Sequence, residues 1–264
     1  MQSGSETAML LNVKQLDSIL WEQLGTAATA CRTGAAVAVT AVFTVVARAA
    51  RGVSPSGAAA GALVSFLLYI SAGPGAFVVL VSVFVLALIT TRLEYSRKER
   101  LGTAERSDGR TASQVFANLA VGTAAALLFA IRGGTSYLLA FCGALAEAAA
   151  DTVSGEYGQA NSEQSRLITT WELVPAGTDG GVTFAGTAAG GIAAFIVSVV
   201  ATSVRLIPWS WVTLSALAGI FGMLLDSVLG AWLERRRFMN NDTVNFLSTL
   251  LAAMAALLLG HLSS

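Results

Sequence analysis

Charged residues are scarce in this chain. They make up 12% of its 264 residues, whereas apolar residues make up 55%, and the mean hydropathy is +0.68. A typical soluble domain carries about 25% charged residues. A water-soluble globule of this size could not cover its surface with so few charges. The composition therefore excludes a soluble enzyme and a disordered chain, and it predicts a polytopic α-helical membrane protein.

Histidine and cysteine are almost absent. His261 is the one histidine, and Cys31 and Cys142 are the two cysteines, with no CxxC pattern. This excludes histidine-based catalysis and zinc sites of the His/Cys type. The 16 basic residues balance the 16 acidic residues, so we expect no nucleic-acid partner.

Several motifs of membrane and phosphate chemistry are also missing. The chain has no GK[ST] phosphate-binding loop. It lacks the second Asp-rich motif of intramembrane prenyltransferases and the downstream Asp-x-x-x-Asp of CDP-alcohol phosphotransferases. A histidine-dependent lipid phosphatase cannot be built from His261 alone.

The N-terminal segment 1–32 has no basic n-region before an apolar core, so a cleaved signal peptide is not indicated. Its apolar residues instead recur at helical spacing. This pattern predicts an amphipathic helix at the membrane interface, or a short tether packed on the bundle. The residues concerned are Met9, Leu10, Val13, Leu16, Leu20 and Leu24.

The remainder, 33–264, is predicted to be a single transmembrane domain. A membrane span needs about 20 apolar residues, and we expect about seven to eight spans in an all-α bundle. The apolar runs are 33–50, 55–72, 74–92, 113–131, 134–150, 184–204, 208–232 and 242–262.

Basic residues predict the topology. They concentrate in the loop 93–112, which the positive-inside rule places in the cytoplasm. Alternation then puts the Arg48/Arg51 turn, the loop 151–183 and the Arg235–Arg237 turn on the same side. We expect a plasma membrane of bacterial type, with these loops on its cytoplasmic side.

Acidic residues within or directly beside the apolar runs are the first indication of a functional site. Glu147 and Asp151 share one helix face at spacing i, i+4, Glu156 follows, and Asp226 lies within the seventh run. Burying a carboxylate there costs about 2.5–3.5 kcal/mol even on the lenient insertion scale. A bound Mg²⁺, held with substrate phosphates, would relieve their mutual repulsion. The alternative is that each is an ordinary charge at a helix end.

A glycine-rich loop is the second indication, comprising Gly177, Thr178, Asp179, Gly180 and Gly181. Glycines let backbone N–H groups converge on an anion, and the next helix N-terminus adds a positive dipole end. The alternative is a tight turn, with Gly186 and Gly190 serving close helix packing.

Polar and basic residues complete the candidate site. Asn241, Asn245 and Ser248 form a stripe on the last run, which also suits interhelical hydrogen bonds, as do Gln114 and Asn118. Lys98, Arg110 and Arg166 are candidate phosphate ligands, although basic residues at this end also fit the topology signal alone.

The motifs occur in a recognisable order. Leu101-Gly-Thr-Ala-Glu105 and Gly109-Arg110 precede Ala150-Asp151-Thr-Val-Ser154-Gly-Glu156-Tyr-Gly158. Leu167-Ile-Thr-Thr170, Val174-Pro-Ala-Gly177-Thr-Asp-Gly-Gly181, Asp226-Ser-Val-Leu-Gly230-Ala231 and Asn241…Val244-Asn245 follow. Over about 33–262 the chain resembles the domain-of-unknown-function 92 membrane family. That family includes transmembrane-protein-19-like proteins and plant and cyanobacterial phytyl-phosphate kinases.

The resemblance implies an isoprenoid (phytyl or prenyl) monophosphate kinase that uses Mg²⁺ and a nucleoside triphosphate, with CTP as the expected donor. Asp151, Glu156 and Asp226 would be catalytic, and Asp151, Glu156 and Glu147 would hold the metal. The expected phosphate and nucleotide ligands are Lys98, Arg110, Arg166, Gly177, Thr178, Asp179, Gly180, Gly181, Asn241 and Asn245.

Two departures from the plant-type pattern affect the substrate. Gly155 stands where those proteins often have Ser, and Gln159 stands where they often have Lys, which removes one phosphate contact.

Two alternative functions stay open: a transporter or flippase of an anion or lipid phosphate, and a non-catalytic membrane protein. The expected partners are an isoprenoid phosphate lipid and the membrane, and the sequence allows a homo-oligomer.

Overall fold

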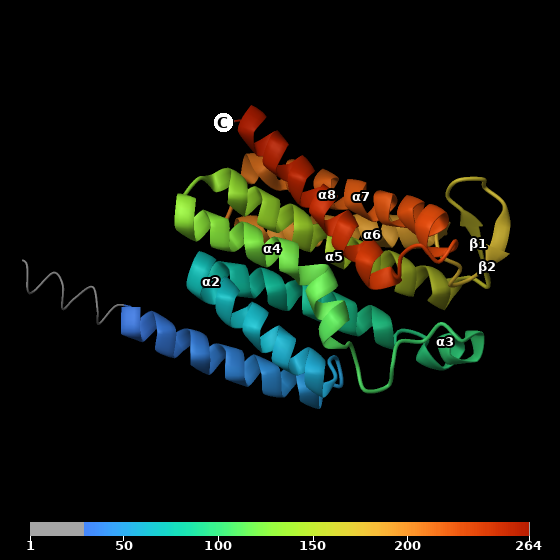
Figure 1. Cartoon of the computed structure of the whole chain (residues 1–264), viewed down its shortest axis with the longest axis horizontal. Coiled ribbons are helices and arrows are strands. Elements are labelled where there is room, and N and C mark those ends of the chain that lie inside the picture. The colour runs from blue at the N-terminus through green and yellow to red at the C-terminus, as the bar shows by residue number, and fades with distance from the viewer. Residues whose placement is uncertain (1–28, 264) are drawn as a thin grey trace, which may run out of the picture.

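The computed structural model describes residues 29–263. Its architecture is an all-helical bundle with one small sheet at one end (Figure 1). The predicted amphipathic helix within 1–32 falls almost entirely outside the described residues, and residues 29–32 belong to the first transmembrane helix. The helices are α1 (Thr29–Ala49), α2 (Pro55–Arg92), α3 (Tyr95–Leu101), α4 (Ala112–Arg132), α5 (Thr135–Asn161), α6 (Phe184–Ser203), α7 (Val212–Leu229) and α8 (Asn241–Leu262).

Seven helices of the described chain are long and apolar enough to cross a membrane, and α2 crosses it twice. A straight helix of 38 residues would be about 57 Å long, nearly twice the hydrocarbon thickness. Gly73 instead has φ 82° and ψ −173°, followed by Pro74. As a result the rings of Tyr69 and Phe77 meet at 6.3 Å, and the Arg92 guanidinium donates to the Ala50 carbonyl. The structure thus has eight passes, which confirms the predicted bundle.

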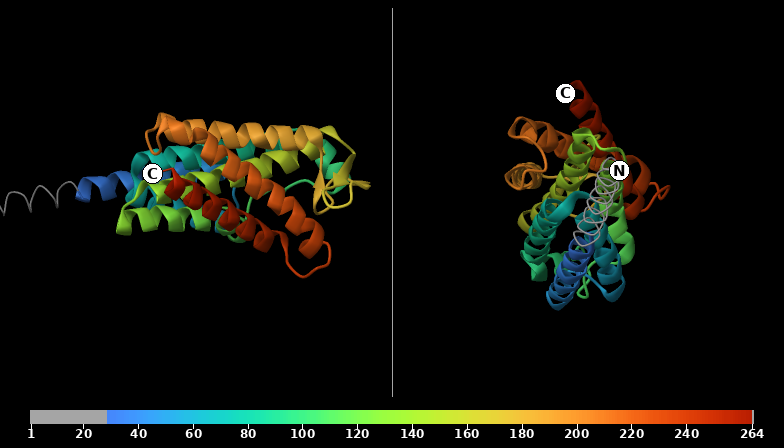
Figure 2. Two further views of the ribbon diagram at one scale, coloured as in Figure 1. Left: turned by 90° about the horizontal axis from the view of Figure 1, so that it is seen from above. Right: turned by 90° about the vertical axis from the view of Figure 1, so that its left-hand side faces the viewer.

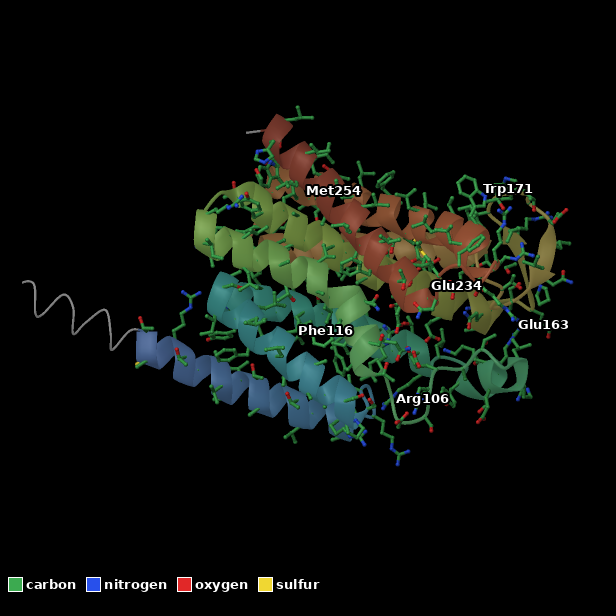
Figure 3. All side chains as sticks on the ribbon, viewed as in Figure 1. Arg106, Phe116, Glu163, Trp171, Glu234 and Met254 are labelled. Atoms are coloured by element: carbon green, nitrogen blue, oxygen red, sulfur yellow. The ribbon has the colours of Figure 1, made fainter. Side chains whose placement is uncertain are left out.

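The eight passes bring the turns that carry several basic residues to one end, here called the site end, while Arg132 and Arg205 lie at the other. Figure 1 shows α3, β1 and β2 there, with the C-terminus at the other end. The end-on view in Figure 2 looks along the bundle from that opposite end. Polar side chains gather at the site end, where Figure 3 labels Arg106, Glu163 and Glu234, whereas Phe116 and Met254 lie along the helices.

Helix α5 is the centre of the bundle. It contacts α2, α4, α6, α7 and α8 and is buried over most of its circumference. Small residues permit these close crossings. A Cβ on Gly219 would lie 2.8 Å from that of Ala146, and a Cβ on Gly186 would lie 2.5 Å from the Ser154 carbonyl oxygen. The pair Gly186 and Gly190 therefore serves helix packing, as one reading of the sequence expected.

The segment 151–183, expected as a loop, begins as helix. Residues 151–161 continue α5 because no proline interrupts them and their polar side chains face a cavity rather than lipid. A three-stranded antiparallel sheet follows, in the order β2-β1-β3. Its strands are β1 (Gln164–Leu167), β2 (Leu173–Pro175) and β3 (Gly181–Val182). The last strand of the sheet ends directly before α6, where the Thr183 side chain caps the helix by accepting from the Gly186 N–H.

The end of α7 changes geometry at the site. A π-helical turn, η2 (Gly230–Glu234), follows Leu229 directly, and η1 (Trp209–Trp211) precedes α7 at the other end. The glycine-rich loop packs against η2, because a Cβ on Gly180 would lie 2.5 Å from the Ala231 Cβ. This contact fixes where the loop lies relative to α7.

Candidate functional site

Two cavities meet at the site end. The first, the polar cavity, has a volume of about 320 Å³ and lies among α5, α7, α8 and the segment 176–183. The second, the apolar chamber, has a volume of about 340 Å³ and lies among α1, α2 and α4. The residues common to both linings are Glu105, Arg110, Gln114, Asn118 and Thr152.

A pair of carboxyl groups from different helices lies in the polar cavity. Asp151 of α5 and Asp226 of α7 face each other as a hydrogen-bonded pair, with Arg110 acting electrostatically on Asp151. Asp226 Oδ2 also accepts from the Asn245 amide and from Ser248 Oγ, each at 3.1 Å. Two carboxylates in direct contact repel each other, so the pair either shares a proton or binds a cation.

The oxygen-rich donor set suits Mg²⁺. Within residues 29–263, however, no three His, Cys, Asp or Glu side chains gather closely enough to hold a metal ion by themselves. Mg²⁺ is usually held by one or two carboxylates together with substrate phosphates. The Asp151–Asp226 pair fits that pattern, in which phosphate oxygens and water complete the coordination.

Glu147 lies behind this pair rather than in the cavity. It is 1% exposed, and its Oε1 accepts from Ser248 Oγ at 2.7 Å. Its Oε2 has no hydrogen-bond partner in the part of the chain that the structure describes. The Ser248 hydroxyl thus lies between Glu147 and Asp226 and connects them indirectly.

Glu156 lines the polar cavity but is paired within the protein. Its Oε2 lies 2.5 Å from Lys98 Nζ, and its Oε1 accepts from the Thr91 hydroxyl at 2.9 Å. Lys98 is fully buried and also donates to the carbonyls of Thr90 and Thr91, at 3.0 and 2.8 Å. All three ammonium hydrogens are therefore occupied, and Lys98 ties α3 to the ends of α2 and α5.

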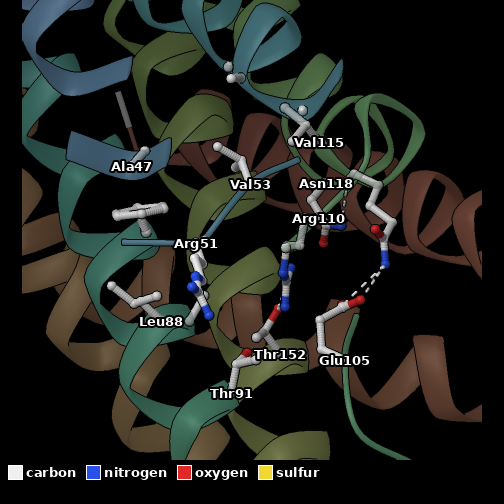
Figure 4. A pocket seen from close by; sticks show the side chains of 18 of the residues that line it. Ala47, Arg51, Val53, Leu88, Thr91, Glu105, Arg110, Val115, Asn118 and Thr152 are labelled. Carbon is white, nitrogen blue, oxygen red and sulfur yellow. Dashed lines mark hydrogen bonds between the residues drawn. The ribbon is translucent and has the colours of Figure 1, made fainter. Parts of the chain in front are cut away.

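Arg110 reaches the boundary between the two cavities. Its backbone pairs with the turn after α1: its N–H donates to the Gly52 carbonyl at 3.2 Å, and its carbonyl accepts from the Ser54 N–H at 3.0 Å. Its guanidinium donates to Thr152 Oγ1 at 3.3 and 3.4 Å. Figure 4 shows Arg110 and Arg51 pointing the same way, toward Thr152 and Thr91. A planar cation in this position can hold an anion bidentately.

The glycine-rich loop lines the opposite side of the polar cavity, and all five of its candidate residues take part. The Thr178 hydroxyl donates to the Pro175 carbonyl at 2.7 Å, which closes the turn. No backbone hydrogen bond among the described residues uses the N–H groups of Gly177, Asp179 or Gly180. Burial raises the pKa of Asp179, and the Arg235 guanidinium opposes that shift. The loop therefore offers unused donors next to the α6 N-terminus.

The remaining candidates divide into two groups. Asn241 and Asn245 line the polar cavity. Arg166 lies on β1, exposed, lines neither cavity, and donates to the Trp171 carbonyl at 2.8 Å. Side chains alternate between the two faces of β1. Ser165 and Leu167 are buried on one face, so Arg166 lies on the other, exposed face.

Sequence reasoning assigned no role to Thr152 and Glu105, and for Gln114 and Asn118 it left open a role in the site or in interhelical hydrogen bonds. The structure places all four at the boundary between the cavities. The Gln114 amide donates to Glu105 Oε2 at 3.1 Å and forms a capping box with Thr111. The signal available was the Gly-Thr-Ala-Glu105 motif, whose glutamate stands nine residues before Gln114.

Comparison with known proteins shows which family this chain is similar to. The family described as Integral membrane protein DUF92 matches residues 38–253. An uncharacterized membrane protein of Methanocaldococcus jannaschii is 29% identical over 241 residues, covering 90% of this chain and 98% of the relative. The chloroplastic protein VTE6 of Arabidopsis thaliana is 30% identical over 217 residues, covering 79% of this chain and 65% of VTE6, just under two thirds. No solved structure matches the chain.

Proposed function

Because the chain belongs to the integral membrane protein DUF92 family, we propose that it is a membrane-embedded isoprenoid monophosphate kinase. It transfers a phosphoryl group from a nucleoside triphosphate, preferably CTP, to a phytyl or prenyl monophosphate and yields the diphosphate. The observation that carries this proposal is the junction of the two cavities at Arg110, where a charged head and an apolar tail can be held together. The resemblance to phytyl-phosphate kinases supports it.

The two cavities give the two substrates separate places. The acceptor phosphate lies at the junction, against Arg110, Thr152 and the amides of Gln114 and Asn118. The donor triphosphate lies across the polar cavity, against the unused N–H groups of the glycine-rich loop and the N-terminus of α6. Asp151 and Asp226 are the residues that would hold Mg²⁺, and the ion would supply neutralisation of charge on the donor phosphates.

The chemistry needs positioning more than proton transfer. An oxygen of the acceptor phosphate attacks the γ-phosphorus of the donor, and a new O–P bond forms. The bond from that phosphorus to the bridging β–γ oxygen breaks, and the nucleoside diphosphate leaves with the electron pair. Because the acceptor is already an anion, no general base is required, which suits a site without histidine. Arg110 and the loop N–H groups stabilise the charge that develops on the transferred group.

The site end is proposed to face the cytoplasm, where nucleotides are available. Arg48 and Arg92 contact the backbone of the turns at this end, and Arg235 acts on Asp179 of the glycine-rich loop. The positive-inside rule favours a cytoplasmic location for an end so rich in arginine.

The test is direct transfer of label. Purified protein in detergent with Mg²⁺ would receive farnesyl, geranylgeranyl or phytyl monophosphate together with γ-labelled CTP or ATP. We expect label in the lipid diphosphate, and a loss of about 10²–10³-fold in Asp151→Asn. Glu99→Gln is the matched control, since it removes the same charge from an exposed position on α3.

Two outcomes would contradict the kinase. One is no transfer with any donor and acceptor pair from protein that unfolds cooperatively, and flux of phosphate into liposomes would then favour a transporter. The other is full transfer by Asp151→Asn, which would remove the carboxylate pair from the reaction.

A further inference from the structure

We propose that the apolar chamber holds the isoprenoid tail of the acceptor, and that the tail enters it sideways from the bilayer between α1 and α2. This assignment rests on the proposed kinase function and specifies how its lipid substrate is bound.

The lining of the chamber suits a branched hydrocarbon chain. Phe43 of α1 and Phe84 of α2 meet edge to face at 5.3 Å, and Leu80, Val83 and Leu88 continue the apolar wall. The polar part of the lining includes the five residues shared with the polar cavity and the arginines Arg51, Arg92 and Arg106. An amphiphile whose anionic head lies at Arg110 would therefore direct its chain into this space.

The chamber adjoins a second cavity at the protein surface. A shallow cavity, here called the side opening, is lined by Thr44, Val45, Arg48, Ala49, Arg51 and Ala58. It shares Thr44, Arg51 and Ala58 with the chamber. Val45, near the end of α1, also lines it and is 67% exposed. The side opening therefore adjoins the chamber between α1 and the start of α2, where the lipid chain would enter.

Charge at the side opening matches the head of the proposed occupant. Across residues 29–263, the Arg51 side chain makes no hydrogen bond or ion pair, and Figure 4 shows it pointing into the chamber. Arg48 is held in place by donating to the carbonyls of Val53 and Asp108, at 3.0 and 3.3 Å. An anionic head would thus meet an unpaired cation first and Arg110 second.

Two glycines allow a matched test. Gly61 of α2 lines the chamber, and a Cβ there would meet nothing within 4 Å. Gly34 of α1 is also helical with nothing within 4 Å of a Cβ, and it lines none of the three cavities. Replacing either with leucine favours helix formation, and in both cases the new Cβ meets nothing within 4 Å, but only Gly61→Leu adds a side chain at the chamber lining.

The experiment uses a farnesyl monophosphate with a diazirine at the far end of its chain, cross-linked to the full chain in nanodiscs. We expect labelled peptides from the chamber walls, within 43–61 and 80–88. Gly61→Leu should reduce this labelling by about tenfold because it excludes two or three methylene groups, whereas Gly34→Leu should leave it unchanged. Phytyl monophosphate should compete with the probe, and dioleoyl phosphatidic acid should not.

The outcomes separate the tail site from the kinase. Labelling confined to other helices, with phosphoryl transfer intact, would overturn the tail assignment and leave the kinase standing. Labelling of the chamber without transfer would keep the tail site and contradict the kinase. Equal loss of labelling in Gly34→Leu, or competition by phosphatidic acid alone, would overturn the proposal.

Discussion

The polar cavity and the apolar chamber have nearly equal volumes, about 320 and 340 Å³, but their walls differ in how deeply they are packed in the protein as well as in polarity. The polar cavity is built on α5, whose most apolar window is 83% buried inside the protein. The chamber is walled by α1, whose window is 17% buried. Displacing α1 disturbs few protein contacts, whereas displacing α5 disturbs the whole bundle. The contrast teaches that the proposed reacting groups lie on the most deeply packed helix, whereas the proposed lipid entry lies beside the least buried one.

The largest difference between the two regions is expected when the glycine-rich loop is displaced, because only the polar cavity should be affected. In Gly180→Ala the new Cβ would lie 2.5 Å from that of Ala231, and φ is +75°. The loop must withdraw from η2, and a misplacement of about 1 Å costs about 10²-fold in rate. We expect phosphoryl transfer to fall by that factor while tail cross-linking is unchanged.

The control for that loop variant is Gly102→Ala. Gly102 has φ +72°, but a Cβ there meets nothing within 4 Å. Gly102→Ala therefore introduces only backbone strain, about 1–2 kcal/mol. Its rate of phosphoryl transfer should stay near that of the parent protein. Equal losses in the two variants would mean that strain, not the position of the loop, limits the reaction.

Arg110→Lys tests the boundary between the regions. The substitution keeps the charge but removes the planar fork that can hold a phosphate bidentately. We expect kcat/KM for both lipid and nucleotide to fall by about tenfold, equivalent to about 1.4 kcal/mol. Steady-state rates measured over a range of lipid and nucleotide concentrations give kcat/KM for each substrate. An effect on the nucleotide alone would place the acceptor phosphate elsewhere.

The smallest effect is expected for Glu147→Gln. This carboxyl is buried behind Ser248 and lines neither cavity, so its neutral isostere should change transfer by no more than about threefold. The thermal midpoint should change little, because the glutamine amide keeps the shape of the side chain and its oxygen can still accept from Ser248 Oγ. A loss of activity comparable to that of Asp151→Asn would instead make Glu147 a metal ligand, as the sequence suggested.

The fold could be predicted from the sequence because the bilayer restricts the solutions to helices of spanning length. The apolar runs located every pass, and separate runs on either side of Gly73 anticipated the reversal of α2. The sheet at 164–182 could not be foreseen, since its strands are two to four residues long and carry no periodicity.

The site was predictable where the signal was a charge in hydrocarbon. Asp151 and Asp226 stood out because a carboxylate there needs compensation, and the structure brings them together. The behaviour of Lys98 could not be read in advance, because its pairing with Glu156 joins residues 58 positions apart. The apolar chamber escaped notice because its lining has the same composition as any transmembrane surface.

The central position of α5 has a consequence for how the family can vary in length. Each residue of an α-helix advances the face by about 100°. Along α5, Gly143 meets Ala256, Glu147 meets Gly222, and Asp151 meets Asp226, all on one face. Deleting one residue between them would turn the carboxylates away from their partners while leaving every residue type in place. Length changes should therefore accumulate in the turns between helices, and α5 should keep a fixed count of residues from Gly143 to Glu156.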